Sequence, residues 1–224
     1  MHYRRDAESC VNILFEIYVY NCCMNQHQQA TEFLSAIDAD WANLIDTVGA
    51  CQFAPKVERN PYEALVRAVA YQQLHTKAGD AIIGKLINHF SQFPTPEQLI
   101  AAPFNHLRSC GFNGRKIETI QGIANGVMTG LVPSIESAQK MTNAELIERL
   151  VSLKGIGQWT VEMMLMFTLM RMDILPVTDF GVVEGYKRLK KLEAAPKPKQ
   201  MAEIALTFSP HRTVASWYLW RVPR

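Results

Sequence analysis

Two glycines separated by one apolar residue, Gly155 and Gly157, precede a helix-like apolar run in the stretch LKGIGQWTVEMMLMF (153–167). Without side chains at these positions, the loop amides and the first N–H groups of the next helix face outward, where the helix dipole favours an anion. This pattern predicts phosphate binding by bare backbone. A tight turn between two helices would also explain Gly155, so both interpretations stay open on this stretch alone. A dinucleotide-binding fingerprint is excluded, because Thr160 occupies the third glycine position and no strand precedes it.

A carboxylate follows about one helix length later, in the stretch LPVTDFGVVEGYKRL (175–189). Asp179 lies where a loop meets a new helix, so its simplest role is that of an N-cap, and the local sequence favours this role. A second role is compatible with the first, because the helix dipole favours a negative charge at this position. A fixed anion of this kind suits a site where positive charge develops in a transition state.

The elements that must position these residues are predicted to be helices. Alternating apolar and polar runs typical of strands are missing, so the predicted fold class is all-α. Helix-start signals, each a cap residue with or without a following proline or capping box, occur at Asn60-Pro61, Thr76, Thr95-Pro96 and Thr142 with Glu145. We predict helices at 61–74, 77–90, after Pro96, at 115–128, at 143–153, from the hairpin to about 171, at 180–192, near 198–207 and from about 210.

Composition sets limits on partners and cofactors. The chain of 224 residues carries a formal charge of +2, which permits a nucleic-acid partner without arguing for one. Its five cysteines form no CxxC pair and its six histidines form no HExxH motif, so we expect reduced thiols and no metal-binding motif. No run is long enough to span a bilayer, so no membrane partner is expected. We expect residues 1–27 to form a poorly ordered tail and the protein to be cytoplasmic, associated with the nucleoid if it is bacterial.

The hairpin LKGIGQWTVEM (153–163) followed by PVTDFGV (176–182) resembles the helix-hairpin-helix DNA glycosylase superfamily, and most closely its AlkA-like DNA-3-methyladenine glycosylase II branch. The resemblance extends from about Pro61 to SPHRTVASWYLW (209–220). It implies two helical subdomains around a cleft, here one domain over 28–224 with its hairpin at 142–171. Asp179 matches the catalytic aspartate. The DNA-binding positions implied for the hairpin are Gly155, Ile156, Gly157, Gln158 and Thr160.

Further roles follow from the same resemblance. Relatives that also cut the DNA backbone carry a lysine where this chain has Trp159, so a monofunctional enzyme is implied. Iron–sulfur members need a cysteine cluster near the C-terminus, and no cysteine follows Cys110, so that cofactor is not expected. The base pocket is expected to contain Trp159, Met163 and Trp220, although both tryptophans could instead be plain core residues. Backbone carbonyls of Val151, Leu153 and Ile156 are expected to bind a monovalent cation, Na⁺ or K⁺.

The segment YQQLHT (71–76) resembles the loop that fills the gap left by an extruded base. Gln73, Leu74 and His75 are candidates for insertion into DNA. The alternative is a buried Leu74 with His75 facing solvent, and the sequence does not decide between them.

The function expected from these residues is excision of alkylated purines, such as 3-methyladenine and 7-methylguanine, from duplex DNA by a monomeric glycosylase of base-excision repair. Two alternatives remain at this stage. One is a glycosylase that also has lyase activity, and the other is a helix-hairpin-helix module that binds DNA without catalysis.

Overall fold

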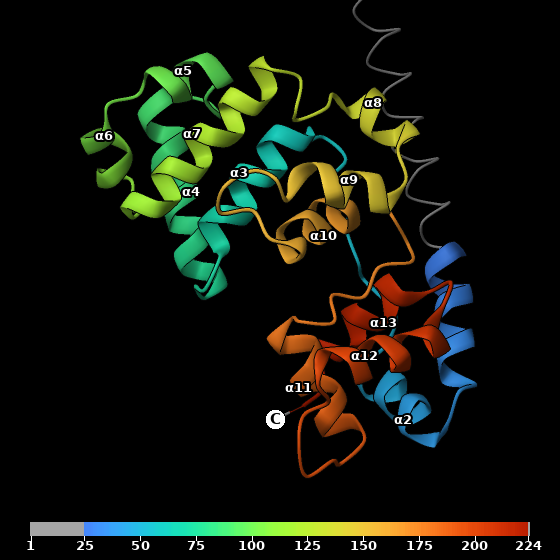
Figure 1. Cartoon of the computed structure of the whole chain (residues 1–224). Coiled ribbons are helices and arrows are strands. Elements are labelled where there is room, and N and C mark those ends of the chain that lie inside the picture. Colours follow the sequence, from blue (N-terminus) through green and yellow to red (C-terminus); the bar gives the residue numbers. More distant parts are fainter. Residues whose placement is uncertain (1–24, 224) are drawn as a thin grey trace, which may run out of the picture. The chain divides into compact units, whose positions relative to one another are not determined.

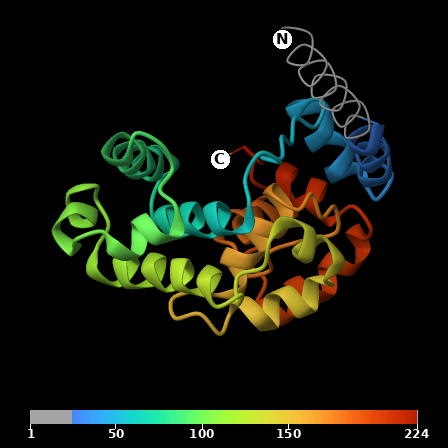
Figure 2. The same cartoon turned by 90° about the horizontal axis from the view of Figure 1, so that it is seen from above.

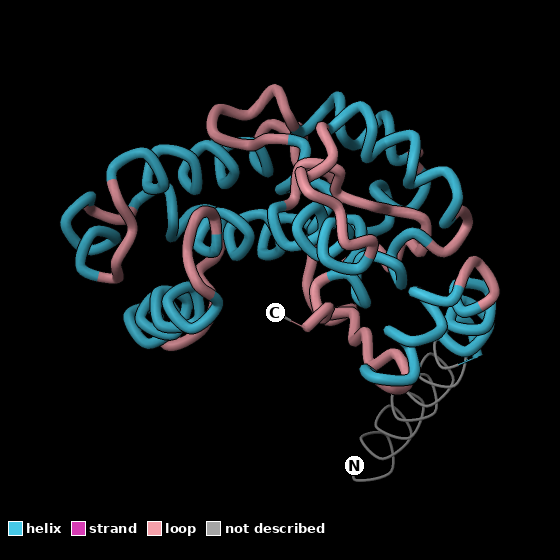
Figure 3. The backbone as a smooth tube through the Cα atoms, turned by 90° about the horizontal axis from the view of Figure 1, so that it is seen from below, coloured by secondary structure: helices cyan, strands magenta, loops and turns pink. Residues whose placement is uncertain are grey.

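The described residues, 25–223 of this computed structural model, form helices and loops without a strand (Figures 1 and 3), which confirms the predicted all-α class. A helix over 25–35 comes first. It is followed by α2 (Ala39–Val48), α3 (Pro61–Tyr71), α4 (Thr76–Phe90), α5 (Pro96–Ala101), α6 (Phe104–Ser109), α7 (Gly114–Met128), α8 (Ile135–Lys140), α9 (Asn143–Leu150), α10 (Gln158–Phe167), α11 (Phe180–Leu189), α12 (Pro198–Ala205), the 3₁₀ helix η1 (Leu206–Phe208) and α13 (Arg212–Leu219). The predicted tail lies outside the described residues as far as residue 24, whereas residues 25–27 are helical.

The chain divides into two compact units. The central unit is one continuous segment, Ala54–Ile174, and the terminal unit combines the described residues 25–53 and 175–223. The hairpin belongs to the central unit, and Asp179 belongs to the terminal unit.

Helix α3 is the core of the central unit. Eight of its eleven residues are buried, and it packs against α4, α7 and α10. Figure 2 shows the long helix α7 running alongside α3, and α5 packs on α7 as well. The hairpin helices α9 and α10 pack against each other, so α3 and α7 provide the base on which the hairpin rests.

The terminal unit is held together by contacts between the two ends of the chain. The Tyr218 hydroxyl on α13 donates to the carbonyl of Gly49 at 3.0 Å and lies 3.2 Å from the Thr31 hydroxyl. Trp41 of α2 meets Phe208 edge-to-face with ring centroids 5.1 Å apart. These contacts position α11, which packs against both α2 and α13.

Helix starts largely follow the local capping signals. The side chain of Asn60 accepts the N–H of Glu63 at 2.9 Å, and complete capping boxes form at Thr95 and Thr142. The prediction for Thr76 is wrong. Thr76 is already the first residue of α4, while His75 occupies the N-cap without a side-chain hydrogen bond.

Several helices end earlier than predicted. Helix α3 ends at Tyr71 and α10 at Phe167, short of the predicted 74 and 171. The cause is the backbone that follows each end, because Gln73 and Met170 have positive φ values of 56° and 52°. A right-handed helix cannot continue through such a residue.

Candidate active site and nucleic-acid interface

The two glycines of the hairpin have different structural roles. Gly155 has a φ of +84°, and a Cβ there would lie 2.1 Å from Oγ1 of Thr119 on α7, so both conformation and packing require glycine. Gly157 is the N-cap of α10 with a φ of −101°, and nothing lies within 4 Å of the position of its Cβ. The fold therefore does not need a glycine at 157. What its bare backbone provides is open space in front of the first N–H groups of α10, which no side chain caps.

The residues around these glycines divide into exposed and internal positions. Ile156 is 5% exposed and Thr160 is 1% exposed. The Thr160 hydroxyl accepts a hydrogen bond from Nε2 of Gln72 at 2.9 Å, so this predicted DNA-binding side chain is engaged inside the fold. Gln158 is exposed, and its amide donates to Glu162 one turn later at 2.8 Å. The surface that a phosphate could reach is therefore mainly backbone.

The carbonyls expected to bind a cation lie between α9 and α10. Val151 is the C-cap of α9, and the Leu153 carbonyl accepts the N–H of Ile156 at 3.0 Å. A carbonyl oxygen has two lone pairs, so Leu153 keeps the capacity to bind an ion. The C-terminal end of α9, at Val151, also carries the negative end of the helix dipole, which favours a cation. Neutral carbonyl oxygens are a suitable type of ligand for Na⁺ or K⁺. Among the described residues no group of three or more His, Cys, Asp or Glu side chains is placed to bind a metal.

The predicted insertion loop, Gln73–His75, projects from the end of α3, and we call it the wedge loop. All three side chains are exposed, and Leu74 is 43% exposed. The alternative in which Leu74 is buried is therefore wrong. The positive φ of Gln73 turns the chain out of α3 before α4 begins at Thr76.

Asp179 is the N-cap of α11, as the local sequence predicts. Its Oδ1 accepts the N–H of Val182 at 2.8 Å and also the indole Nε1–H of Trp220 at 2.8 Å. Gly181 makes the second bond feasible, because a Cβ there would lie 2.7 Å from Cδ1 of Trp220 and 3.1 Å from Oδ1 of Asp179. The carboxylate is thus fixed from two directions, by backbone and by an aromatic donor. The sequence did not identify Gly181, since its role appears only once Trp220 is placed.

The predicted site residues fall into two groups. Asp179 and Trp220 lie together in the terminal unit, and beside them Phe180 is 81% exposed at the first position of α11. The half-buried Trp159 and Met163 lie one turn apart on α10 in the central unit, which also carries the hairpin and the wedge loop.

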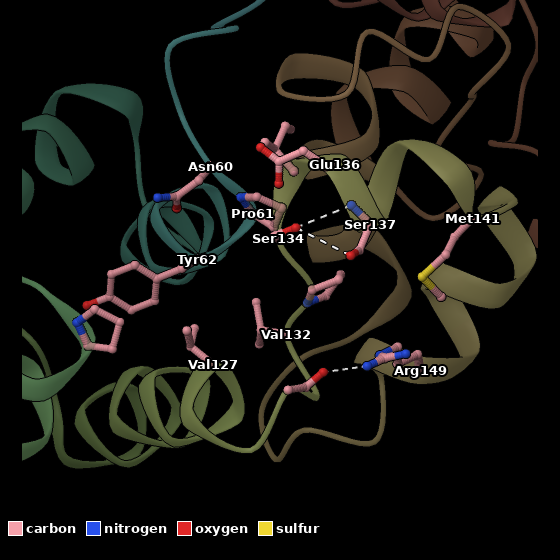
Figure 4. A pocket seen from close by; sticks show the side chains of 14 residues that line it. Asn60, Pro61, Tyr62, Val127, Val132, Ser134, Glu136, Ser137, Met141 and Arg149 are labelled. Atoms are coloured by element: carbon pink, nitrogen blue, oxygen red, sulfur yellow. Dashed lines mark hydrogen bonds between the residues drawn. The ribbon is translucent and has the colours of Figure 1, made fainter.

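A cavity of about 670 Å³ in the central unit contains none of the predicted site residues (Figure 4). Its wall includes Tyr62, Val132, Met141 and Arg149. The guanidinium of Arg149 donates to the carbonyls of Gly130 and Leu131, which fixes the loop after α7. The cavity thus belongs to the packing of this loop and not to the predicted chemistry.

A family profile described as "HhH-GPD superfamily base excision DNA repair protein" matches residues 66–210, a span that contains the wedge loop, the hairpin and Asp179. The chain belongs to this superfamily. It is 43% identical over 194 residues to DNA-3-methyladenine glycosylase 1 of Schizosaccharomyces pombe, with 85% of each chain covered. It is 34% identical over 203 residues to the alkylbase DNA glycosidase-like protein mag2 of the same yeast, covering 89% of this chain and 95% of the relative.

Solved structures of the superfamily share the fold. The S. pombe 3-methyladenine DNA glycosylase Mag1 in complex with abasic DNA superposes with a TM-score of 0.83 at 41% identity, covering 86% of this chain and 95% of that one. A DNA-3-methyladenine glycosidase from Bacillus halodurans gives a TM-score of 0.72 at 33% identity, with 86% of this chain and 88% of that one covered.

Within the described residues, none of the helices has the length and apolar character needed to cross a bilayer.

Proposed function

We propose that the protein is a monofunctional DNA glycosylase that hydrolyses the N-glycosidic bond of alkylated purines, such as 3-methyladenine and 7-methylguanine, in duplex DNA. The observation that carries this proposal is the anchored carboxylate of Asp179, bonded through Oδ1 to Val182 and Trp220 in a chain of this superfamily. A module that only bound DNA would have no need of such an arrangement.

The reaction requires an anion close to the sugar. As the bond between C1′ and the base nitrogen breaks, its electron pair leaves with the base and the sugar gains oxocarbenium character. The negative charge of Asp179 stabilises this cation, and a water attacks C1′ and passes its proton to the carboxylate. Because two hydrogen bonds fix Oδ1, the carboxylate does not have to reorganise during the reaction. A purine alkylated on its ring is already cationic and leaves without acid catalysis.

The residues on α10 support hydrolysis without strand cleavage. Strand cleavage through a Schiff base needs an amine at position 159, where this chain has a tryptophan. Lys154 precedes the first glycine and its Nζ lies 2.6 Å from Glu118 of α7, so it is directed to a surface ion pair. Trp159 offers instead an aromatic face on which a flipped, cationic base would stack. Met163, one turn later on α10, would line the same face. Trp220 is a second candidate for stacking on the base, and its indole N–H binds Asp179.

Duplex DNA is the proposed partner. Gly155, Gly157 and Gln158 would hold a phosphate at the hairpin, and Gln73, Leu74 and His75 would fill the gap left by the flipped base. The carbonyls of Val151, Leu153 and Ile156 would hold Na⁺ or K⁺, whose charge would favour the same phosphate. Replacing both ions by a bulky organic cation at constant ionic strength should then weaken DNA binding and lower the melting temperature. Monomeric state and cytoplasmic localisation stay predictions, the first testable by light scattering.

The deciding experiment is excision from a panel of defined duplexes, each with one modified base. Abasic sites that break only after heat or alkali would indicate monofunctional hydrolysis. Direct strand breaks would indicate lyase activity and overturn the role given to Trp159. Intact DNA throughout, despite binding, would favour a module that only binds DNA.

A further inference from the structure

Lys116 on α7 holds the end of α3. Its Nζ donates to the carbonyls of Ala70 and Gln72, both at 2.9 Å. The last carbonyls of a helix have no intrahelical partner, and a cation there also meets the negative end of the helix dipole. In this position the ammonium group loses part of its hydration, and this burial lowers the pKa of Lys116. The two hydrogen bonds offset that loss only while the end of α3 stays in place.

Gln72 connects the same point to the hairpin. Its carbonyl is bound by Lys116, while its side-chain Nε2 donates to the carbonyl of Gly155 at 3.2 Å and to Oγ1 of Thr160 at 2.9 Å. One turn after Lys116, Thr119 packs so closely on Gly155 that no Cβ would fit between them. Helix α7 therefore supports both the end of α3 and the hairpin, and Gln72 bridges the two.

The wedge loop begins at the next residue. Gln73 leaves α3 through a left-handed conformation, and the exposed Leu74 follows directly. The position of this loop relative to the hairpin therefore depends on Gln72 and on the lysine that binds its carbonyl. All of these residues lie in the central unit, so their relative placement does not depend on the terminal unit.

We infer that Lys116 and Gln72 are positioning residues that set the wedge loop at a fixed place relative to the phosphate-binding hairpin, so that DNA held by its backbone meets the inserting side chain where the base must leave. This inference rests on the proposed function. It predicts a specific defect. A displaced wedge loop leaves backbone binding intact but impairs extrusion of a base from a paired duplex. The defect should fade when the base is already unpaired, because extrusion then costs little.

The test compares Lys116→Met with the wild-type protein in single-turnover excision of one lesion in two contexts. The first duplex pairs the lesion normally, and the second places it opposite an abasic site. We expect a loss on the order of a hundredfold on the paired duplex, the size typical of small misplacements. On the unpaired substrate the loss should be about tenfold smaller, since less extrusion is required. The affinity for undamaged duplex should stay within about twofold, because the hairpin supplies that binding.

Two further variants keep the test decisive. Lys85→Met, at an exposed position of α4, removes the same charge away from the wedge loop and should excise like the wild type from both substrates. Gln72→Leu keeps the carbonyl that Lys116 binds but loses the side-chain hydrogen bonds to the hairpin. Gln72→Leu takes the place of Lys116→Met in the test if a thermal melt shows that Lys116→Met is unfolded. Equal losses on both substrates, or no loss on the paired one, would overturn the inference. Wild-type protein that excises neither substrate would instead refute the proposed function.

Discussion

The substitution Asp179→Asn separates catalysis from capping at one atom. An asparagine oxygen can still accept from Val182 and Trp220, and Asn caps helices about as well as Asp. A hydrogen bond to a charged acceptor is worth about 1 kcal/mol more than one to a neutral acceptor. Because Asp179 is half-buried and the cap is retained, we expect a total loss of about 1 kcal/mol, or roughly 2–4 °C in melting temperature.

The rate should fall much further than the stability. Losing one preorganised electrostatic group typically costs about 100-fold or more in the chemical step, which corresponds to about 2.7 kcal/mol. The assay is single-turnover excision of a neutral and a cationic base, run beside a thermal melt. The loss should be smaller for cationic 7-methylguanine, whose glycosidic bond is already weakened, than for any neutral base that the enzyme accepts.

Asp38 provides a matched control in the same unit. It is the N-cap of α2, and its carboxylate accepts the N–H groups of Asp40 and Trp41 at 3.0 and 3.1 Å. Asp38→Asn should lower the melting temperature by a similar amount and leave excision within about twofold, since asparagine keeps the cap and the substitution removes only the ion pair with Lys190 at the surface. If Asp179→Asn behaves like Asp38→Asn in both measurements, Asp179 is a cap alone and the catalytic assignment is wrong.

Three further predictions address the hairpin, the pocket and the response to pH. Gly157→Glu should weaken binding to damaged and undamaged duplexes alike in filter-binding assays. Gly157→Ala, whose Cβ meets nothing within 4 Å, should bind DNA nearly as tightly as the wild type. Unchanged affinity of the Gly157→Glu variant would show that the hairpin does not bind DNA. Trp159→Ala should lose up to about 30-fold more excision on cationic 3-methyladenine than on neutral bases, as expected for about 2 kcal/mol of cation–π attraction, and equal losses would indicate packing alone. Burial lowers the pKa of His27 below its ordinary 6.5, so the unfolded chain binds the proton more readily and stability is lost as pH falls through 6.5. His27→Leu should therefore melt at a less pH-dependent temperature between about pH 8 and 5, and a variant as pH-sensitive as the wild type would contradict this.

Features set by neighbouring residues were predictable, and features set by distant ones were not. The helix starts at Asn60, Thr95 and Thr142 follow from side chains that bond amides three residues ahead. The ends of α3 and α10 were misplaced, because Gln73 and Met170 have left-handed conformations that non-glycine residues seldom adopt and that the local sequence does not signal.

In the candidate site, too, the features set by neighbouring residues were predictable and those set by distant residues were not. Asp179 could be found because a cap and its helix are contiguous in sequence. Its bond to Trp220 spans 41 residues and could not be read from local pattern. Lys116 could have been singled out from the sequence, since helical spacing places it on the same face of α7 as the buried Ile120 and Ile123, four and seven residues later. A charged residue on an apolar face has to find buried partners, and here these are two carbonyls.

The division of the chain into a continuous and a split unit has a consequence for biosynthesis. Folding during translation proceeds from the N-terminus, and domains generally fold as units. The central unit is complete once Ile174 has emerged, whereas Thr31, Trp41 and Gly49 must wait for Phe208 and Tyr218. A nascent chain can therefore form its hairpin before Asp179 has received the indole hydrogen bond of Trp220. Under the proposed function, a ribosome-bound chain would acquire affinity for DNA before it could hydrolyse a base, and the hydrolytic half would be assembled last.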